Sequence, residues 1–132
     1  MPLFKKEIVL KNVRDVQKLV DDFVSYLQSD NYKVQQRFEG DRAIVQAQKG
    51  GILRDIVAAE RALTFVFEKQ GNDVKVTVGV GKWLQNIAVT AIEALLLSEI
   101  FLLVDVPEML WNSHVESVLL KKLEEIASKS QQ

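Results

Sequence analysis

The spacing of hydrophobic residues changes along the chain, and each spacing predicts a different element. Residues 5–11 hold a short β-prone core, after which Asn12 can cap a helix beginning at Val13. Apolar residues then recur at intervals of three and four, which is typical of an amphipathic helix. These residues are Val13, Val16, Leu19, Val20, Phe23 and Leu27. The turn-forming residues 29–31 should end this helix.

In the middle of the chain the spacing falls to two, which indicates strands. Residues 32–38 and 42–48 flank a turn at Gly40 and predict one hairpin, and residues 63–68 and 74–80 flank a turn at Gly71 and predict another. In the last run valines alternate with polar residues or glycines, so we expect one apolar face and a second face that is open to water or lies against a close neighbour. Those alternating residues are Lys75, Thr77, Gly79 and Gly81.

The most apolar part of the chain is residues 87–104, in which 14 of 18 residues are apolar. This length approaches that of a membrane span, but Glu93 and Glu99 would each cost several kcal/mol near the centre of a bilayer. We therefore interpret this segment, called the apolar run below, as deeply buried structure outside a membrane. A helical pattern from Leu84 to Leu95 has an outer side too apolar for a simple surface helix. Residues 99–104 fit either a strand or a helix.

The C-terminal part predicts a final helix. Asp105 can cap it, Pro107 fits its first turn and Glu108 can complete a capping box, so it should run to about Ser128. The resulting order β-α-β-β-β-β-α-α predicts an α+β fold, with an antiparallel sheet of about five strands and helices packed on one face. We expect a single domain over residues 1–128, followed by a frayed tail over residues 129–132.

Composition and charge narrow the possible functions. With 132 residues and 48% hydrophobic content, the chain is long enough for one domain with its own core. Lysine and arginine total 17 against 18 acidic residues, so no net field favours nucleic acid or an anionic membrane. Tyr32 and Phe38 alternate away from the basic residues Lys33 and Arg37, which also argues against nucleic-acid binding. Cysteine is absent and no secretion signal is apparent, so we expect a cytoplasmic protein.

Candidate chemistry is sparse. The sequence Gly79-Val80-Gly81-Lys82 lacks the spacing of a phosphate-binding loop, and its glycines are better explained by a close approach of the strand end to a neighbour. His114 is the single histidine, which excludes a multi-histidine metal site. We predict no catalytic residue, no metal and no cofactor. One weaker hypothesis is an anion site, if two loops share one end of the sheet, formed by Lys49, Arg54, Arg61 and Lys82.

Residues 81–112, GKWLQNIAVTAIEALLLSEIFLLVDVPEMLWN, together with Gly51-Ile52-Leu53-Arg54 and Arg61-Ala62-Leu63, carry a resemblance. They resemble a family of small bacterial domains in which a strand ends in Gly-Lys-Trp, an alanine- and leucine-rich helix follows, and a Val-Asp-Val-Pro-Glu-Met-Leu-Trp segment opens the last helix. This resemblance implies a self-contained bacterial module and transfers no catalytic residue. The order of elements is also similar to helix-grip and TATA-binding-protein-like sheets, which implies no function.

Two functional hypotheses follow. In the first, the chain is a non-catalytic interaction module that self-associates or binds a protein partner through the apolar run and its helix. Its contact residues would be Val89, Leu96, Leu97, Phe101 and Leu102. In the second, a lipid-like or other apolar small ligand binds between the sheet and the helices. Its cavity walls would be Phe65, Phe67, Trp83 and Trp111. Membrane contact through residues 100–103 is less favoured, because Glu99 and Asp105 oppose docking on anionic lipid.

Overall fold

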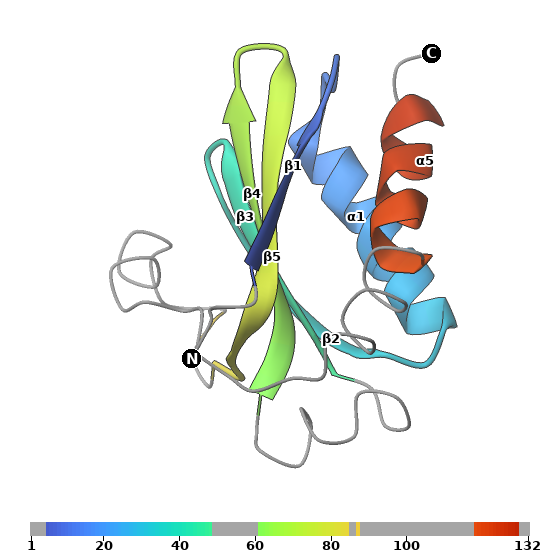
Figure 1. Ribbon diagram of the computed structural model, residues 1–132, viewed down its shortest axis with the longest axis vertical. Helices are drawn as coiled ribbons and strands as arrows, with labels where there is room; N and C mark the ends of the chain where they lie inside the picture. Colours follow the sequence, from blue (N-terminus) through green and yellow to red (C-terminus); the bar gives the residue numbers. More distant parts are fainter. Residues whose placement is uncertain (1–4, 49–60, 85–86, 88–117, 130–132) are drawn as a thin grey trace.

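The computed structural model describes residues 5–48, 61–84, 87 and 118–129. These residues form a five-stranded sheet and two helices (Figure 1). In chain order the elements are β1 (Lys5–Leu10), α1 (Val16–Ser29), β2 (Lys33–Glu39), β3 (Arg42–Gln48), β4 (Arg61–Gln70), β5 (Asp73–Lys82) and α5 (Lys121–Lys129). The predicted α+β class is confirmed, and so is the predicted order of those elements that lie within the described residues. The expected helix after Trp83 and the expected start of the last helix lie outside the described residues.

The sheet has the order β1-β5-β4-β3-β2, and every neighbouring pair is antiparallel. β2 and β3 form one hairpin and β4 and β5 form the other, as the alternating pattern predicts. Gly40 and Gly71 have φ angles of 61° and 65° and occupy the first of the two turn positions, where a type II′ turn requires glycine. β1 and β2 are consequently the two edges of the sheet.

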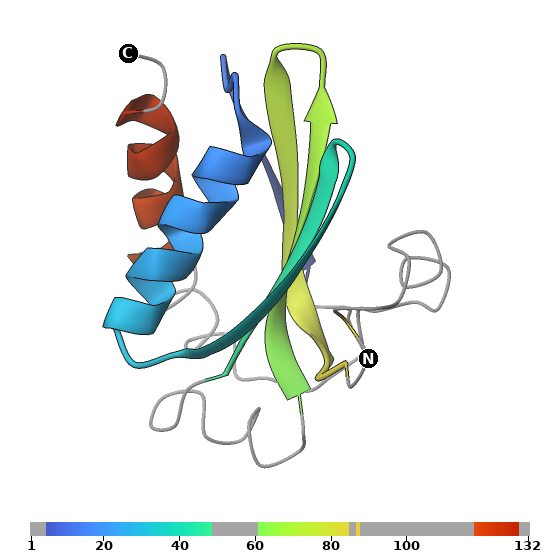
Figure 2. The same ribbon diagram turned by 180° about the vertical axis from the view of Figure 1, so that it is seen from behind.

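Both described helices cover the same face of the sheet, which we call the helical face (Figures 1 and 2). α1 packs on β2, on β3 and on α5. Phe23 of α1 lies at the centre, where its ring meets Phe65 edge-on at 5.0 Å and Phe67 at 6.3 Å. All three rings are fully buried. Val74, Val76 and Val78 of β5 share this core, so the valine ladder faces the helices as its period of two predicts.

The helix α1 begins three residues later than the sequence suggests. Asn12 does not cap it, because Asn12 has a left-handed φ of 56° and the N–H of Val13 is bonded to the carbonyl of Asn72 at 2.8 Å. Asp15 is the N-cap, and its carboxylate accepts a hydrogen bond from the amide of Lys18 at 3.1 Å. The prediction was wrong here because a long-range contact with a hairpin turn holds residues 12 and 13 outside the helix.

The opposite side of the sheet, called the second face below, is also buried at its centre. Ile44 and Val66 are 0% and 2% exposed, although neither belongs to the core beneath the helices. Thr77 is 6% exposed, and Gly79 and Gly81 are buried. Of the two possibilities for this face, open to water or against a close neighbour, the burial of these residues fits the second. No helix within the described ranges is long and apolar enough to cross a membrane.

Candidate functional site

A row of polar side chains crosses the second face at right angles to the strands. The register pairs Gln35 of β2 with Gln46 of β3, Gln46 with Thr64 of β4, and Thr64 with Gly79 of β5. Since side chains directly opposite each other in a sheet lie on the same face, these residues are neighbours. Gln46 and Thr64 are both 0% exposed. The row therefore places polar groups in a region from which water is excluded.

Gln46 is the centre of the row, and its amide uses both of its donors and both of its acceptor positions. Its Nε2 donates to the Thr64 hydroxyl at 3.1 Å and to the carbonyl of Lys82 at 2.7 Å. Its Oε1 accepts from the amide of Leu84 at 2.9 Å and from Nε2 of Gln35 at 2.8 Å. A buried amide satisfied in this way avoids the cost of an unpaired polar group.

These bonds hold the chain that follows β5 across the second face. Gln46 contacts both the carbonyl of Lys82 and the amide of Leu84, and Gln35 donates to the carbonyl of Leu84 at 2.9 Å. The two glutamines thus bond to the main chain of residues 82–84, and these residues turn from β5 over β3 and β2. We call this arrangement the glutamine clamp. Ile87, three residues beyond the clamp, is 3% exposed.

Trp83 sits within the clamped segment and is half-buried. The ammonium of Lys33, on the same face of β2, lies 4.9 Å from the centre of a Trp83 ring. A cation over an indole face contributes about 0.5–1 kcal/mol at an exposed site. Trp83 therefore packs against the second face, which is the side of the sheet away from α1.

The other residues proposed for a ligand cavity lie elsewhere. Phe65 and Phe67 are fully buried on the helical face, where Phe23 fills the space beside them. Trp83 and these two phenylalanines are thus on opposite sides of the sheet. Trp111 lies outside the described residues. The structure does not bring the described members of this set around one cavity.

The remaining predicted positions are only partly within the described chain. Arg61 of β4 and Lys82 of β5 are direct partners in the register of the two strands. The main chain of two of the four residues of the suggested anion site therefore lies side by side. Lys49 and Arg54 lie outside the described residues. The same is true of all five proposed contact residues, Val89, Leu96, Leu97, Phe101 and Leu102.

The glutamine clamp was missed by the sequence analysis. A signal for it exists, because Gln46 interrupts the otherwise apolar run Ala43-Ile44-Val45-Gln46-Ala47, and a glutamine at a buried strand position requires hydrogen-bond partners. Its main-chain partners at residues 82 and 84 could not be identified without the topology. Within residues 5–48, 61–84 and 118–129 no group of three or more acidic, histidine or cysteine side chains is placed to hold a metal ion.

Comparisons with known proteins add a structural likeness. No family model and no curated protein matches the chain. Among solved structures, the chain is similar to the crystal structure of TTHA0849 from Thermus thermophilus, with 15% sequence identity and a TM-score of 0.40. The alignment covers 99% of this chain and 100% of that one. A likeness of this degree carries no argument about function.

Proposed function

We propose that this protein is a non-catalytic interaction module, which pairs with a second copy or with another protein through the apolar run. The contact residues in this proposal are Val89, Leu96, Leu97, Phe101 and Leu102. The same proposal includes a cytoplasmic location, which the absence of cysteine supports.

The observation that carries the proposal is the apolar run itself, set beside the core that the described residues form on the helical face. Among the described residues, the sheet, α1 and α5 form this core, and Phe23, Phe65 and Phe67 are each 0% exposed. The run contributes 14 apolar residues to the sequence, and its first residue, Ile87, is 3% exposed. Large apolar surfaces beyond what a domain needs to close its own core are typical of protein interfaces.

The glutamine clamp supports the same proposal. It fixes residues 82–84 on the second face, only three residues before the apolar run begins. An interface segment that starts from a fixed point loses less conformational entropy on binding than one that starts from a free linker. The ligand-cavity alternative has no comparable support, because Phe65 and Phe67 are packed against Phe23.

Light scattering coupled to size-exclusion chromatography tests this proposal. The unmodified protein should elute with at least twice the 15.0 kDa mass of one chain, and Leu97→Asp or Phe101→Asp should shift it to a monomer with an unchanged circular dichroism spectrum. A buried aspartate at an apolar contact should weaken association at least about tenfold. Val9→Asp is the matched control, since Val9 is 48% exposed on the edge strand β1, outside the apolar run.

The control also separates two kinds of interface. Association through the apolar run should survive Val9→Asp. If Val9→Asp gives a monomer and Leu97→Asp does not, the contact is made by the edge of the sheet and the proposal is wrong. A folded monomer at high micromolar concentration that also captures no partner protein would equally remove it.

A further inference from the structure

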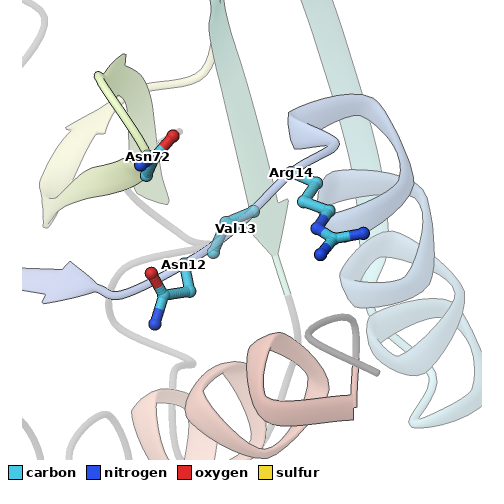
Figure 3. Close-up of a pocket in the computed structure, with 4 residues that line it drawn as sticks. All are labelled: Asn12, Val13, Arg14 and Asn72. Atoms are coloured by element: carbon cyan, nitrogen blue, oxygen red, sulfur yellow. The ribbon is translucent and has the colours of Figure 1, made fainter.

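A pocket of about 470 Å³ opens where the β1–α1 connection meets the turn between β4 and β5 (Figure 3). Its described lining residues are Asn12, Val13, Arg14 and Asn72. Pockets of about 300–1,000 Å³ are typical of sites for small molecules. Asn12 and Arg14 extend from the connection, and Asn72 comes from the hairpin turn (Figure 3). Neither of the functions discussed above involves this pocket.

The backbone of the pocket is fixed by contacts between segments about sixty residues apart. The N–H of Val13 donates to the carbonyl of Asn72 at 2.8 Å, and the carbonyl of Val13 accepts from the ammonium of Lys69 at 2.8 Å. The N–H of Asn12 donates to the carboxylate of Asp73 at 3.2 Å. These bonds hold the main chain of Asn12 and Val13 in place. The side chain of Asn12 is therefore carried on a fixed main chain, which lowers the entropy lost when it binds a ligand, and Arg14 follows directly after this fixed segment.

Among the described residues, the charges around the pocket leave one cation available. Lys11 pairs with Asp73 at 3.2 Å, and Lys69 is bonded to the carbonyl of Val13. The carboxylate of Asp15 accepts the amide of Lys18 at the start of α1. Arg14 is exposed and forms no hydrogen bond or ion pair with another residue of the described ranges.

We propose that this pocket binds the phosphate group of a small molecule. The guanidinium of Arg14 can donate two parallel hydrogen bonds to phosphate oxygens, and the amides of Asn12 and Asn72 can donate to the others. A phosphate presents its oxygens in a tetrahedron and can accept from three donors that approach from different directions, whereas a carboxylate has only two oxygens in one plane. This difference in geometry is why phosphate is favoured over a carboxylate. Val13, which is 1% exposed, anchors this connection in the core.

The test is a titration of the full chain with inorganic phosphate, followed by nuclear magnetic resonance of backbone and side-chain amides at constant ionic strength. Residues Asn12, Arg14 and Asn72 should show saturable shifts with an apparent Kd of about 1–10 mM, as expected for a free ion without the rest of its ligand. Arg14→Gln should weaken binding at least about tenfold. Arg42→Gln is the matched control, since Arg42 is exposed on β3, three strands away from β1.

Several outcomes would overturn the proposal. One is the absence of saturation up to about 50 mM phosphate, and another is an equal response to sodium chloride. Acetate binding as tightly as phosphate would show that the site selects only a negative charge. Asn72→Ala provides a second variant, because the backbone carbonyl of Asn72 that holds Val13 is kept while the amide donor is lost. If this variant binds phosphate as well as the unmodified chain, the assignment of donors is wrong.

Discussion

Replacing Gln46 by leucine should reveal how much the glutamine clamp contributes to stability. Leucine is close in size to glutamine and keeps the position filled, but it offers no hydrogen bond. The carbonyl of Lys82 and the amide of Leu84 then lose the partners they have at 2.7 and 2.9 Å. Gln35 still donates to the carbonyl of Leu84, and Thr64 still donates to the carbonyl of Ala62 at 3.3 Å. The carbonyl of Lys82 and the amide of Leu84 are therefore the two main-chain groups that lose their bond to residue 46.

The expected loss follows from these two groups. A partly or fully buried polar group that loses its partner costs about 1–3 kcal/mol, which gives about 2–6 kcal/mol for both. Burial of the leucine side chain returns about 1–2 kcal/mol relative to the amide. We expect Gln46→Leu to lower the free energy of unfolding by about 1–4 kcal/mol. This is a large part of the stability of a whole domain, which is typically about 5–15 kcal/mol.

Urea denaturation followed by circular dichroism measures this change, and Gln36→Leu is the matched control. Gln36 lies next to Gln35 on β2, and its Oε1 is buried without a hydrogen-bond partner among the described residues. Its replacement removes an unsatisfied group, so the free energy of unfolding should change by less than about 0.5 kcal/mol or increase. If both variants lose the same amount, or Gln46→Leu loses less than about 1 kcal/mol, the clamp does not stabilise the fold as we reason. Hydrogen exchange at Leu84 should also accelerate in Gln46→Leu only.

Two further predictions concern other parts of the molecule. Phe23→Ala should lower the free energy of unfolding by about 3–5 kcal/mol in urea denaturation, because it removes the ring packed between Phe65 and Phe67; a loss below about 1 kcal/mol would contradict the described core. Hydrogen bonds from the Lys11 side chain and the Asn12 backbone hold the pKa of Asp73 below its ordinary value. Asp73 therefore stabilises the fold above the unfolded-state pKa, and this stabilisation is lost as pH falls through the lower folded-state pKa. The loss of stability between about pH 5 and pH 2 should be smaller in Asp73→Asn than in the unmodified protein. An identical pH dependence of the free energy of unfolding in the two proteins would refute this role of Asp73.

The fold could be predicted from the sequence because the hydrophobic residues of its helices and strands are regularly spaced. The spacing of Val16, Leu19, Val20, Phe23 and Leu27 predicts α1, and all five side chains are buried. The two hairpins follow from alternation and from Gly40 and Gly71 at the turns. The position of β1 beside β5 was not predicted, since pairing between strands far apart in sequence depends on the whole topology. The start of α1 was missed for the same reason.

The candidate sites were much harder to predict from the sequence. Gln46 carries a signal, since it is a polar residue within an apolar strand, but its partners lie 36 and 38 residues further along the chain. Asn12, Arg14 and Asn72 look like ordinary turn residues, and only the pairing of β1 with β5 brings them together. Local patterns report which face a side chain occupies. They do not report which loops meet at the end of a sheet.

Hydrogen bonds and apolar packing have complementary physical roles where the chain leaves β5. Burial of apolar side chains is favourable but has no direction, so an apolar segment alone can pack on a sheet in several registers. Hydrogen bonds require a particular donor opposite a particular acceptor. Gln46 contacts the carbonyl of residue 82 and the amide of residue 84, and a shift of one residue would break both bonds. A buried polar network at this position therefore fixes the register in which the chain leaves β5, which apolar packing could not do by itself.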